Sequence, residues 1–199
     1  MKSIGIITIH KIVNYGSVFQ AYALQKICED LGFHSEIIDY NFPNEFHQNN
    51  SYADENDVKN HEPKWIKILY LLALYRQHKG IKNFVDKYQH LSARSYNHPT
   101  ELMRDVPKYD IYMTGSDQLW NPRHTNGDPA FMLHFAPDNA LKVAYAASGT
   151  NQFPDSLQDS FRKLLSRYRA ISVREESGAK AIQALTGRQV HVVLDPTLL

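Results

Sequence analysis

Blocks of apolar residues alternate with amphipathic blocks along the chain, and this pattern predicts strands separated by helices. The continuous apolar run Ser3–Ile9 is typical of a strand covered on both faces, as in a parallel sheet. Ser17–Leu31 has apolar residues at helical spacing, and Gly32 is suited to end that helix. His34–Tyr40 predicts a second strand. The first forty residues therefore predict a right-handed βαβ unit, the building block of a Rossmann-like sheet.

The middle of the chain is less regular. Residues 41–62 are polar and without periodicity, which predicts a long surface loop. Residues 63–91 carry an apolar stripe that predicts a helical insertion of one or two helices, interrupted at Gly80. A stripe of this kind is more often core or a contact between domains than a cofactor site. Asn97–Arg104 predicts a further short helix or turn.

The second half returns to the alternating pattern. Four apolar runs predict strands, and they are Tyr109–Thr114, Lys142–Ala147, Ala170–Val173 and Val190–Leu194. Amphipathic helices are predicted over Asp155–Tyr168 and Arg174–Gly187, and Phe131–Phe135 is either a short strand or a packed loop. The whole pattern predicts one Rossmann-like α/β domain over residues 1–199, a parallel sheet flanked by helices. Because the chain stops on an apolar dipeptide soon after its last strand, we expect it to be a piece of a longer protein.

Composition gives no reason to expect several classes of partner. The 199 residues include 22 Lys and Arg against 21 Asp and Glu, and 43% are hydrophobic, as in a folded globular protein. The near-neutral charge gives no electrostatic reason to expect nucleic acid or an anionic membrane. The only cysteine, Cys28, falls in a predicted helix and suits a reducing compartment. Neither Ile4–Ile9 nor Lys64–Tyr75 is long enough for a signal peptide or a transmembrane segment, so a soluble, cytoplasmic protein is expected.

The most distinctive polar cluster follows the predicted strand Tyr109–Thr114. Loops at the carboxyl ends of parallel strands are where α/β sheets bind ligands. Asp117, Gln118 and Asn121 can hydrogen-bond sugar hydroxyls, and Trp120 has a flat apolar face that can pack against a pyranose. The alternative is that Ser116 or Asp117 caps a short helix while Trp120 fills the core.

The turn after the first strand lacks the Gly-x-Gly-x-x-Gly phosphate motif, so a nicotinamide dinucleotide is not implied. In its place are Asn14, Tyr15, Gly16 and Ser17. Gly16 permits a tight turn and Ser17 can cap the helix, whereas Asn14 and Tyr15 have no obvious capping role and favour a binding function. The helix N-terminus at this turn would favour a bound anion.

Two further residues follow predicted strands. Ser148 lies in a run of small residues that permits either close approach of a ligand or close helix packing. Arg174 can grip a carboxylate or phosphate, or can pair with a neighbouring Asp. No cluster with metal-ligand spacing is visible, and no metal or other cofactor is expected.

Four stretches, taken together, resemble the polysaccharide pyruvyl transferase family. They are NYGSVFQAYALQ from Asn14, YDIYMTGSDQLWNP from Tyr109, VAYAASGT from Val143, and ISVREESG from Ile171 with LDPTLL behind it. The Gly-Ser-Asp-Gln-x-Trp-Asn stretch is the most specific, and Phe19, where an aliphatic residue is common, is a minor departure. The resemblance implies the N-terminal Rossmann-like half of a two-domain fold similar to glycosyltransferase B.

Members of this family transfer the carboxyvinyl unit of phosphoenolpyruvate to a sugar of a bacterial surface polysaccharide (exopolysaccharide) or cell-wall glycan. The resemblance implies that the donor-binding Arg and His residues lie in a second, C-terminal half. It also implies that the N-terminal half, to which this chain corresponds, holds the sugar or glycan-lipid acceptor. It makes Asp117 the candidate base, and a 199-residue piece is expected to be inactive alone. The substrate-binding candidates are Asn14, Tyr15, Gly16, Ser116, Gln118, Trp120, Asn121, Ser148 and Arg174. Two alternatives stay open: a non-catalytic sugar or nucleotide-sugar binding module, and a nucleotide-sugar-dependent glycosyltransferase.

Overall fold

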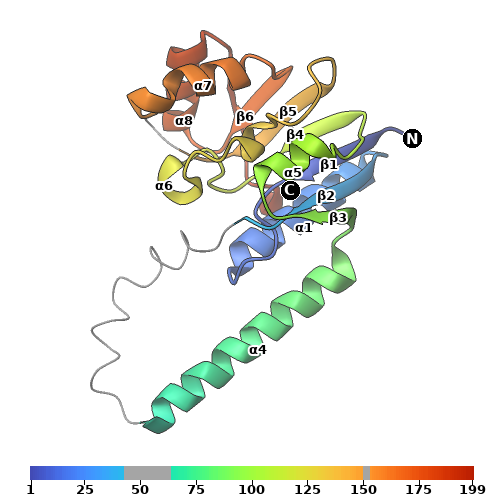
Figure 1. Cartoon of the computed structure of the whole chain (residues 1–199), viewed down its shortest axis with the longest axis vertical. Coiled ribbons are helices and arrows are strands. Elements are labelled where there is room, and N and C mark those ends of the chain that lie inside the picture. The colour runs from blue at the N-terminus through green and yellow to red at the C-terminus, as the bar shows by residue number, and fades with distance from the viewer. Residues whose placement is uncertain (43–63, 150–152) are drawn as a thin grey trace.

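The computed structural model describes residues 1–42, 64–149 and 153–199, and it contains one seven-stranded sheet in which every pair of neighbouring strands is parallel. The strands lie in the order β3-β2-β1-β4-β5-β6-β7 (Figure 1). Their bounds are β1 Ser3–Ile7, β2 His34–Tyr40, β3 Leu91–Tyr96, β4 Ile111–Thr114, β5 Leu141–Ala147, β6 Ala170–Val173 and β7 His191–Val192. The chain thus builds the sheet outward from β1 in one direction and then from β4 in the other, which is the Rossmann-like pattern predicted.

Helices flank the sheet. They are α1 Tyr15–Asp30, α4 Lys64–Tyr88, α5 Pro99–Arg104, α6 Pro122–Thr125, α7 Asp155–Leu165 and α8 Glu176–Thr186, with short 3₁₀ turns η1 Pro129–Met132 and η2 Pro196–Leu198. On one face, Leu24 and Cys28 of α1 pack against Ile4, Ile6 and Ile111 of the sheet. On the other, η1, α7 and α8 bury a larger core. Each face of the sheet is therefore covered, as its Ile-rich strands require.

Cys28 lies in the smaller of these cores. Burial raises the pKa of its thiol to about 11, which outweighs the opposing effect of a hydrogen bond with Ser35. The prediction that this cysteine falls in a helix is confirmed, and a buried thiol of this kind is protonated and inert.

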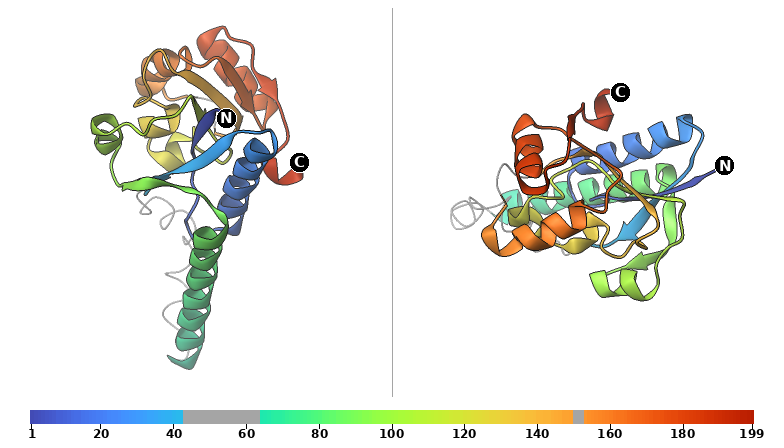
Figure 2. Two further views of the ribbon diagram at one scale, coloured as in Figure 1. Left: turned by 90° about the vertical axis from the view of Figure 1, so that its right-hand side faces the viewer. Right: turned by 90° about the horizontal axis from the view of Figure 1, so that it is seen from above.

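The largest departure from the sequence prediction is α4. It runs as one helix through Gly80, so the predicted break there is wrong. Its last turns pack on α1, whereas its first half extends away from the body of the domain (Figures 1 and 2). The predicted helix also ran too far, because Leu91–Tyr96 forms β3. The predicted polar loop 41–62 lies almost entirely outside the described residues.

The remaining predictions concern short local elements, and most of them agree with the structure. Phe131–Phe135 contains no strand: its first residues belong to η1, and the side chains of Phe131 and Leu133 fill the core. The last strand, β7, is only two residues long. The strand predicted over Ala170–Val173 has the bounds of β6. The short helix expected near residue 100 is α5.

The close approach of β1 to the segment before β4 depends on a glycine. A Cβ built on Gly5 would lie 2.2 Å from Cδ2 of Tyr109. The Tyr109 ring is held in place because its hydroxyl donates to Glu36 Oε2 at 2.7 Å. Only a residue without a side chain leaves room for this ring in the middle of the sheet.

We expect Gly5→Ala to destabilise the fold by about 1–3 kcal/mol, since the added methyl must displace the Tyr109 ring. Urea unfolding measures the change. Gly80→Ala is the matched control, because no atom lies within 4 Å of the added Cβ and alanine favours a helix interior, so stability should rise by up to about 1 kcal/mol. Equal effects at the two positions would contradict this account of Gly5.

Candidate functional site

The loops that build the candidate site start where the order of the strands reverses, between β1 and β4. At this point the loops leaving two neighbouring strands diverge, and open α/β sheets bind their ligands there. Gly115 N donates to Ile7 O at 3.0 Å, and Thr8 Oγ1 donates to Ser116 O at 2.8 Å. These bonds join the two loops directly beyond the strands.

Asp117 is the central residue of the loop after β4. Its Oδ2 accepts a hydrogen bond from Ser17 Oγ at 2.6 Å, and its Oδ1 accepts one from its neighbour's backbone, Gln118 N, at 2.7 Å. Its backbone has a φ of 90°, in a region that non-glycine residues rarely adopt. A carboxylate is thus fixed beside the N-terminus of α1, where negative charge is stabilised.

The turn before α1 differs from the sequence prediction in its capping residue. Asn14, expected to have no capping role, is the N-cap: its Oδ1 accepts from Gly16 N at 2.8 Å and Ser17 N at 3.3 Å. Ser17, the predicted cap, donates to Asp117 instead. Tyr15 remains exposed, and its ring is stacked on that of Phe19 with centroids 6.1 Å apart.

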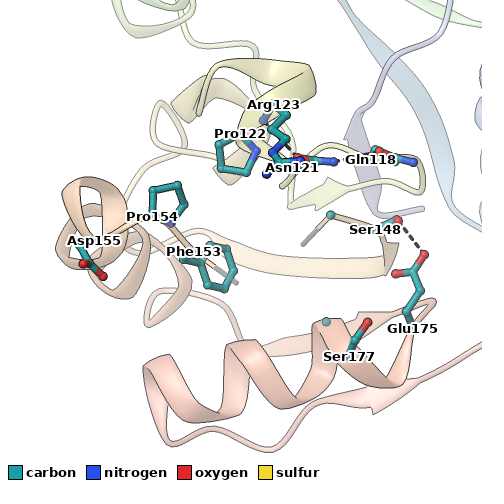
Figure 3. A pocket seen from close by; sticks show the side chains of 12 residues that line it. Gln118, Asn121, Pro122, Arg123, Ser148, Phe153, Pro154, Asp155, Glu175 and Ser177 are labelled. Atoms are coloured by element: carbon teal, nitrogen blue, oxygen red, sulfur yellow. Dashed lines mark hydrogen bonds between the residues drawn. The ribbon is translucent and has the colours of Figure 1, made fainter. Parts of the chain in front are cut away.

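A cavity of about 790 Å³ opens beside this loop, at the carboxyl ends of β4, β5 and β6 (Figure 3). Gln118 and Asn121 line one side, where Asn121 Nδ2 donates to Gln118 Oε1 at 3.1 Å. Ser148 and Glu175 line another, where Ser148 Oγ donates to Glu175 Oε1 at 2.7 Å. Three residues predicted from sequence, Gln118, Asn121 and Ser148, therefore surround one polar cavity.

Glu175 was missed from the sequence because acidic residues are common in the first turn of a helix. It is the N-cap residue of α8 but makes no side-chain capping bond. Its carboxylate instead faces the cavity and Ser148 (Figure 3). The backbone hydrogen bond from Arg174 N to Ala147 O, 3.3 Å, ties the loop after β6 to that after β5. Only this adjacency of two strand ends identifies Glu175 as a site residue.

Trp120 does not face the cavity with its ring. It is 2% exposed, its Nε1 donates to Phe131 O at 3.0 Å, and its ring packs edge-on against Tyr168. The alternative interpretation, in which this residue fills the core, describes its position. Its backbone still shapes the cavity, because a Cβ on Gly149 would lie 2.7 Å from Trp120 C.

Ser116 and Arg174 meet at one carboxylate on the opposite side of the loop. Ser116 Oγ donates to Asp195 Oδ2 at 2.8 Å, and Arg174 Nη1 donates to the same oxygen at 2.7 Å. Burial alone would raise the pKa of Asp195, but the hydrogen bonds from Thr197, Ser116 and Arg174 outweigh it and lower that pKa. Of the two roles predicted for Arg174, the structure shows pairing with a neighbouring Asp. Ser116 is buried.

A second polar cluster, not predicted from the sequence, lies at the carboxyl ends of β1 and β2. His10 Nε2 is 3.1 Å from Asp39 Oδ1, and Lys11 and Ser95 also donate to this carboxylate. His10 and Asp39 are buried, and His10 and Lys11 line a smaller cavity of about 180 Å³. No local sequence pattern indicates this cluster, because its members lie far apart in the chain, from His10 to Ser95.

Burial by itself would raise the pKa of Asp39, but hydrogen bonds from His10, Lys11 and Ser95 hold it below the usual range. Among the described residues, no three His, Cys, Asp or Glu side chains form a group that could hold a metal ion. No described helix has the length and apolar character needed to cross a membrane.

The fold and the site define a Rossmann-like α/β domain with a polar ligand cavity at the carboxyl edge of its sheet. The sequence model of the family described as polysaccharide pyruvyl transferase matches residues 14–199. The chain belongs to the polysaccharide pyruvyl transferase family. Comparisons with curated proteins and with solved structures found no significant match.

We expect Asp39→Asn to destabilise the fold by about 2–4 kcal/mol at pH 7, because it removes the charge of a buried carboxylate that His10, Lys11 and Ser95 share. The pKa of Asp39 is lower in the folded than in the unfolded state. Its stabilising contribution is therefore complete above the unfolded pKa of about 3.9 and is lost as pH falls toward the folded pKa.

Denaturant unfolding of wild type and Asp39→Asn at neutral pH and at about pH 3 measures this contribution, since the acid condition lies below the unfolded pKa. The difference between the two proteins should shrink in acid. A difference that stays constant across this range would show that the carboxylate charge is not its source.

Proposed function

We propose that the full-length protein transfers the carboxyvinyl unit of phosphoenolpyruvate to a sugar, and that this domain holds the acceptor sugar in the 790 Å³ cavity. The cavity carries this proposal. Its wall presents the amides of Gln118 and Asn121 and the hydroxyl of Ser148, groups that both donate to and accept from sugar hydroxyls. Its position at the carboxyl edge of a sheet in this family supports a substrate role.

The charges around the cavity favour a neutral sugar over the donor. The charged residues that line it are Arg123, Asp155 and Glu175, two carboxylates against one guanidinium. Phosphoenolpyruvate carries a phosphate and a carboxylate, and binding it calls for several cationic groups. We therefore propose that the donor is held mainly by residues other than those lining this cavity, in a second domain.

The transfer needs one proton delivered and one removed. An acid protonates the methylene carbon of phosphoenolpyruvate, the acceptor oxygen bonds to the adjacent carbon, and a base takes the hydroxyl proton. Phosphate then leaves the adduct and a second hydroxyl of the sugar bonds to the same carbon, which closes a ketal; the proton of that second hydroxyl leaves with the phosphate. The bonds that form and break balance without an oxidant or a metal.

We propose Asp117 as the base. Its carboxylate belongs to the loop that also supplies Gln118 and Asn121 to the cavity, and it is only partly buried. Hydrogen bonds from Ser17 and from Gln118 N orient its two oxygens, and each oxygen keeps a lone pair to accept a proton. Glu175, which faces the cavity directly, is the rival for this role.

The first experiment measures phosphate release from phosphoenolpyruvate by the full-length protein over a panel of lipid-linked and nucleotide-activated sugars, with the 199-residue chain beside it. Acceptor-dependent release by the full-length form is the expected result. Release of a nucleoside diphosphate from a sugar nucleotide would replace the proposal with a glycosyltransferase. Saturable sugar binding without any turnover would replace it with a binding module.

We expect Asp117→Asn to lower kcat/KM by about 10²–10⁴-fold, the usual contribution of a general base, because the amide cannot take the hydroxyl proton. Asparagine tolerates the left-handed backbone at this position, so the fold should survive. Asp110→Asn is the matched control, since Asp110 precedes the same strand at the opposite edge of the sheet and bonds to Ser3.

Comparison with Glu175→Gln assigns the base. A loss of turnover confined to Glu175→Gln would move the role to Glu175. Normal turnover by Asp117→Asn would remove Asp117 from the mechanism.

A further inference from the structure

The first half of α4 exposes an unusual amount of apolar surface. Trp65 is 61% exposed and Tyr75 is 64% exposed, and the residues between them are apolar except for one lysine. Isolated exposed apolar residues are ordinary, but a contiguous helical surface of this kind marks an interaction site. The views in Figures 1 and 2 agree that this half of α4 stands clear of the other described helices and strands.

The apolar residues form a stripe on the outward face of the helix. Ile81 and Val85 are buried against Val18 of α1, and they define the face that is turned toward the domain. Residues spaced by three and four positions share a different face. These are Trp65, Ile68, Leu69, Leu72 and Tyr75, followed along the same face by Arg76 and Lys79.

The charge of α4 is strongly one-sided. The helix contains six Lys and Arg and one Asp, so its formal charge is +5. The rest of the chain contains 16 Lys and Arg against 20 Asp and Glu, so its formal charge is −4. The net charge of the whole chain is close to zero and hides this separation of charge. The prediction that an anionic surface is not a partner used only the net charge.

We infer that the first half of α4 binds the surface of an anionic lipid bilayer. Trp, Tyr and Leu side chains bury readily at the boundary between head groups and acyl chains, and Lys and Arg side chains pair with anionic head groups. Pairing with the same helix of a second copy would bring two helices of formal charge +5 together. A bilayer supplies both negative charge for the basic side chains and an apolar boundary for the exposed stripe.

The topology places this surface on the same side as the candidate site. In a parallel sheet, a helix that connects two strands runs back from the carboxyl edge to the amino edge. Because α4 ends at Tyr88, just before β3 begins, its first half extends past the carboxyl edge. The inference does not depend on the reaction, because it rests on exposure and charge alone.

The test is co-sedimentation of the full-length chain with vesicles of phosphatidylcholine alone and of phosphatidylcholine with about a quarter phosphatidylglycerol, whose negative surface attracts basic segments. We expect binding to the anionic vesicles, weakened by salt. Leu69→Glu with Leu72→Glu should lower the partition coefficient by about tenfold or more, because both side chains face outward. Arg76→Gln with Lys79→Gln should weaken binding to anionic vesicles only.

Leu31→Glu is the matched control, because Leu31 is 71% exposed at the end of α1 and lies outside α4. It should bind as wild type does. Trp65 gives a second readout: vesicles should protect its fluorescence from acrylamide, whereas Trp120 is buried from the start. Trp65→Phe assigns that signal.

Equal partitioning of wild type and the double Glu variant would overturn the inference. So would a dimer in light scattering that the same double substitution dissociates, with no vesicle binding, because a second copy would then cover the helix.

Discussion

The junction between the ends of β1 and β4 determines how the candidate site is built. These strands are adjacent in the sheet although more than a hundred residues separate them, and the backbone bond from Gly115 to Ile7 extends their pairing into the loops. Gly115 is needed because a side chain there would press on Thr8 and Leu24, with a Cβ 3.0 Å from Thr8 Cβ. This junction brings the N-terminus of α1 and the carboxylate of Asp117 together. The chain at Asp117 then pairs with the end of β5, where Ser148 N donates to Asp117 O.

The sequence specified most strands and helices because their apolar periods are local. The Ile-rich run of β1 and the stripe of α7 each depend on neighbours within a few residues. β3 was missed because Leu91–Tyr96 is largely polar and half exposed at an edge of the sheet, so its strand character comes from pairing with β2. Gly80 did not break α4 because an exposed glycine costs a helix only about 1 kcal/mol, which the packing of Ile81 and Val85 on α1 exceeds.

The candidate site was predicted in its location more than in its details. The loop after β4 does line a cavity, and the positions of Gln118, Asn121 and Ser148 agree with the expectation that strand ends bring their loops together. The roles of single side chains depended on tertiary partners that no local pattern contains. Trp120 lies in the core, where its Nε1 donates to Phe131 O, and Arg174 pairs with Asp195. The cluster around Asp39 gathers residues from three separate segments of the chain.

Cys28 makes the motions of this architecture measurable. It is the only thiol in the sequence, it lies on the face of α1 that packs against the sheet, and in the folded domain it is both protonated and shielded. A thiol reagent can therefore reach it only when α1 lifts from the sheet, and the rate of labelling reports the frequency of that opening. Ser17 of the same helix donates a hydrogen bond to Asp117. A ligand that stabilises the loop of Asp117 should therefore slow the labelling of Cys28, although the ligand does not contact Cys28. The labelling rate of this one side chain then reports the coupling between the core and the site.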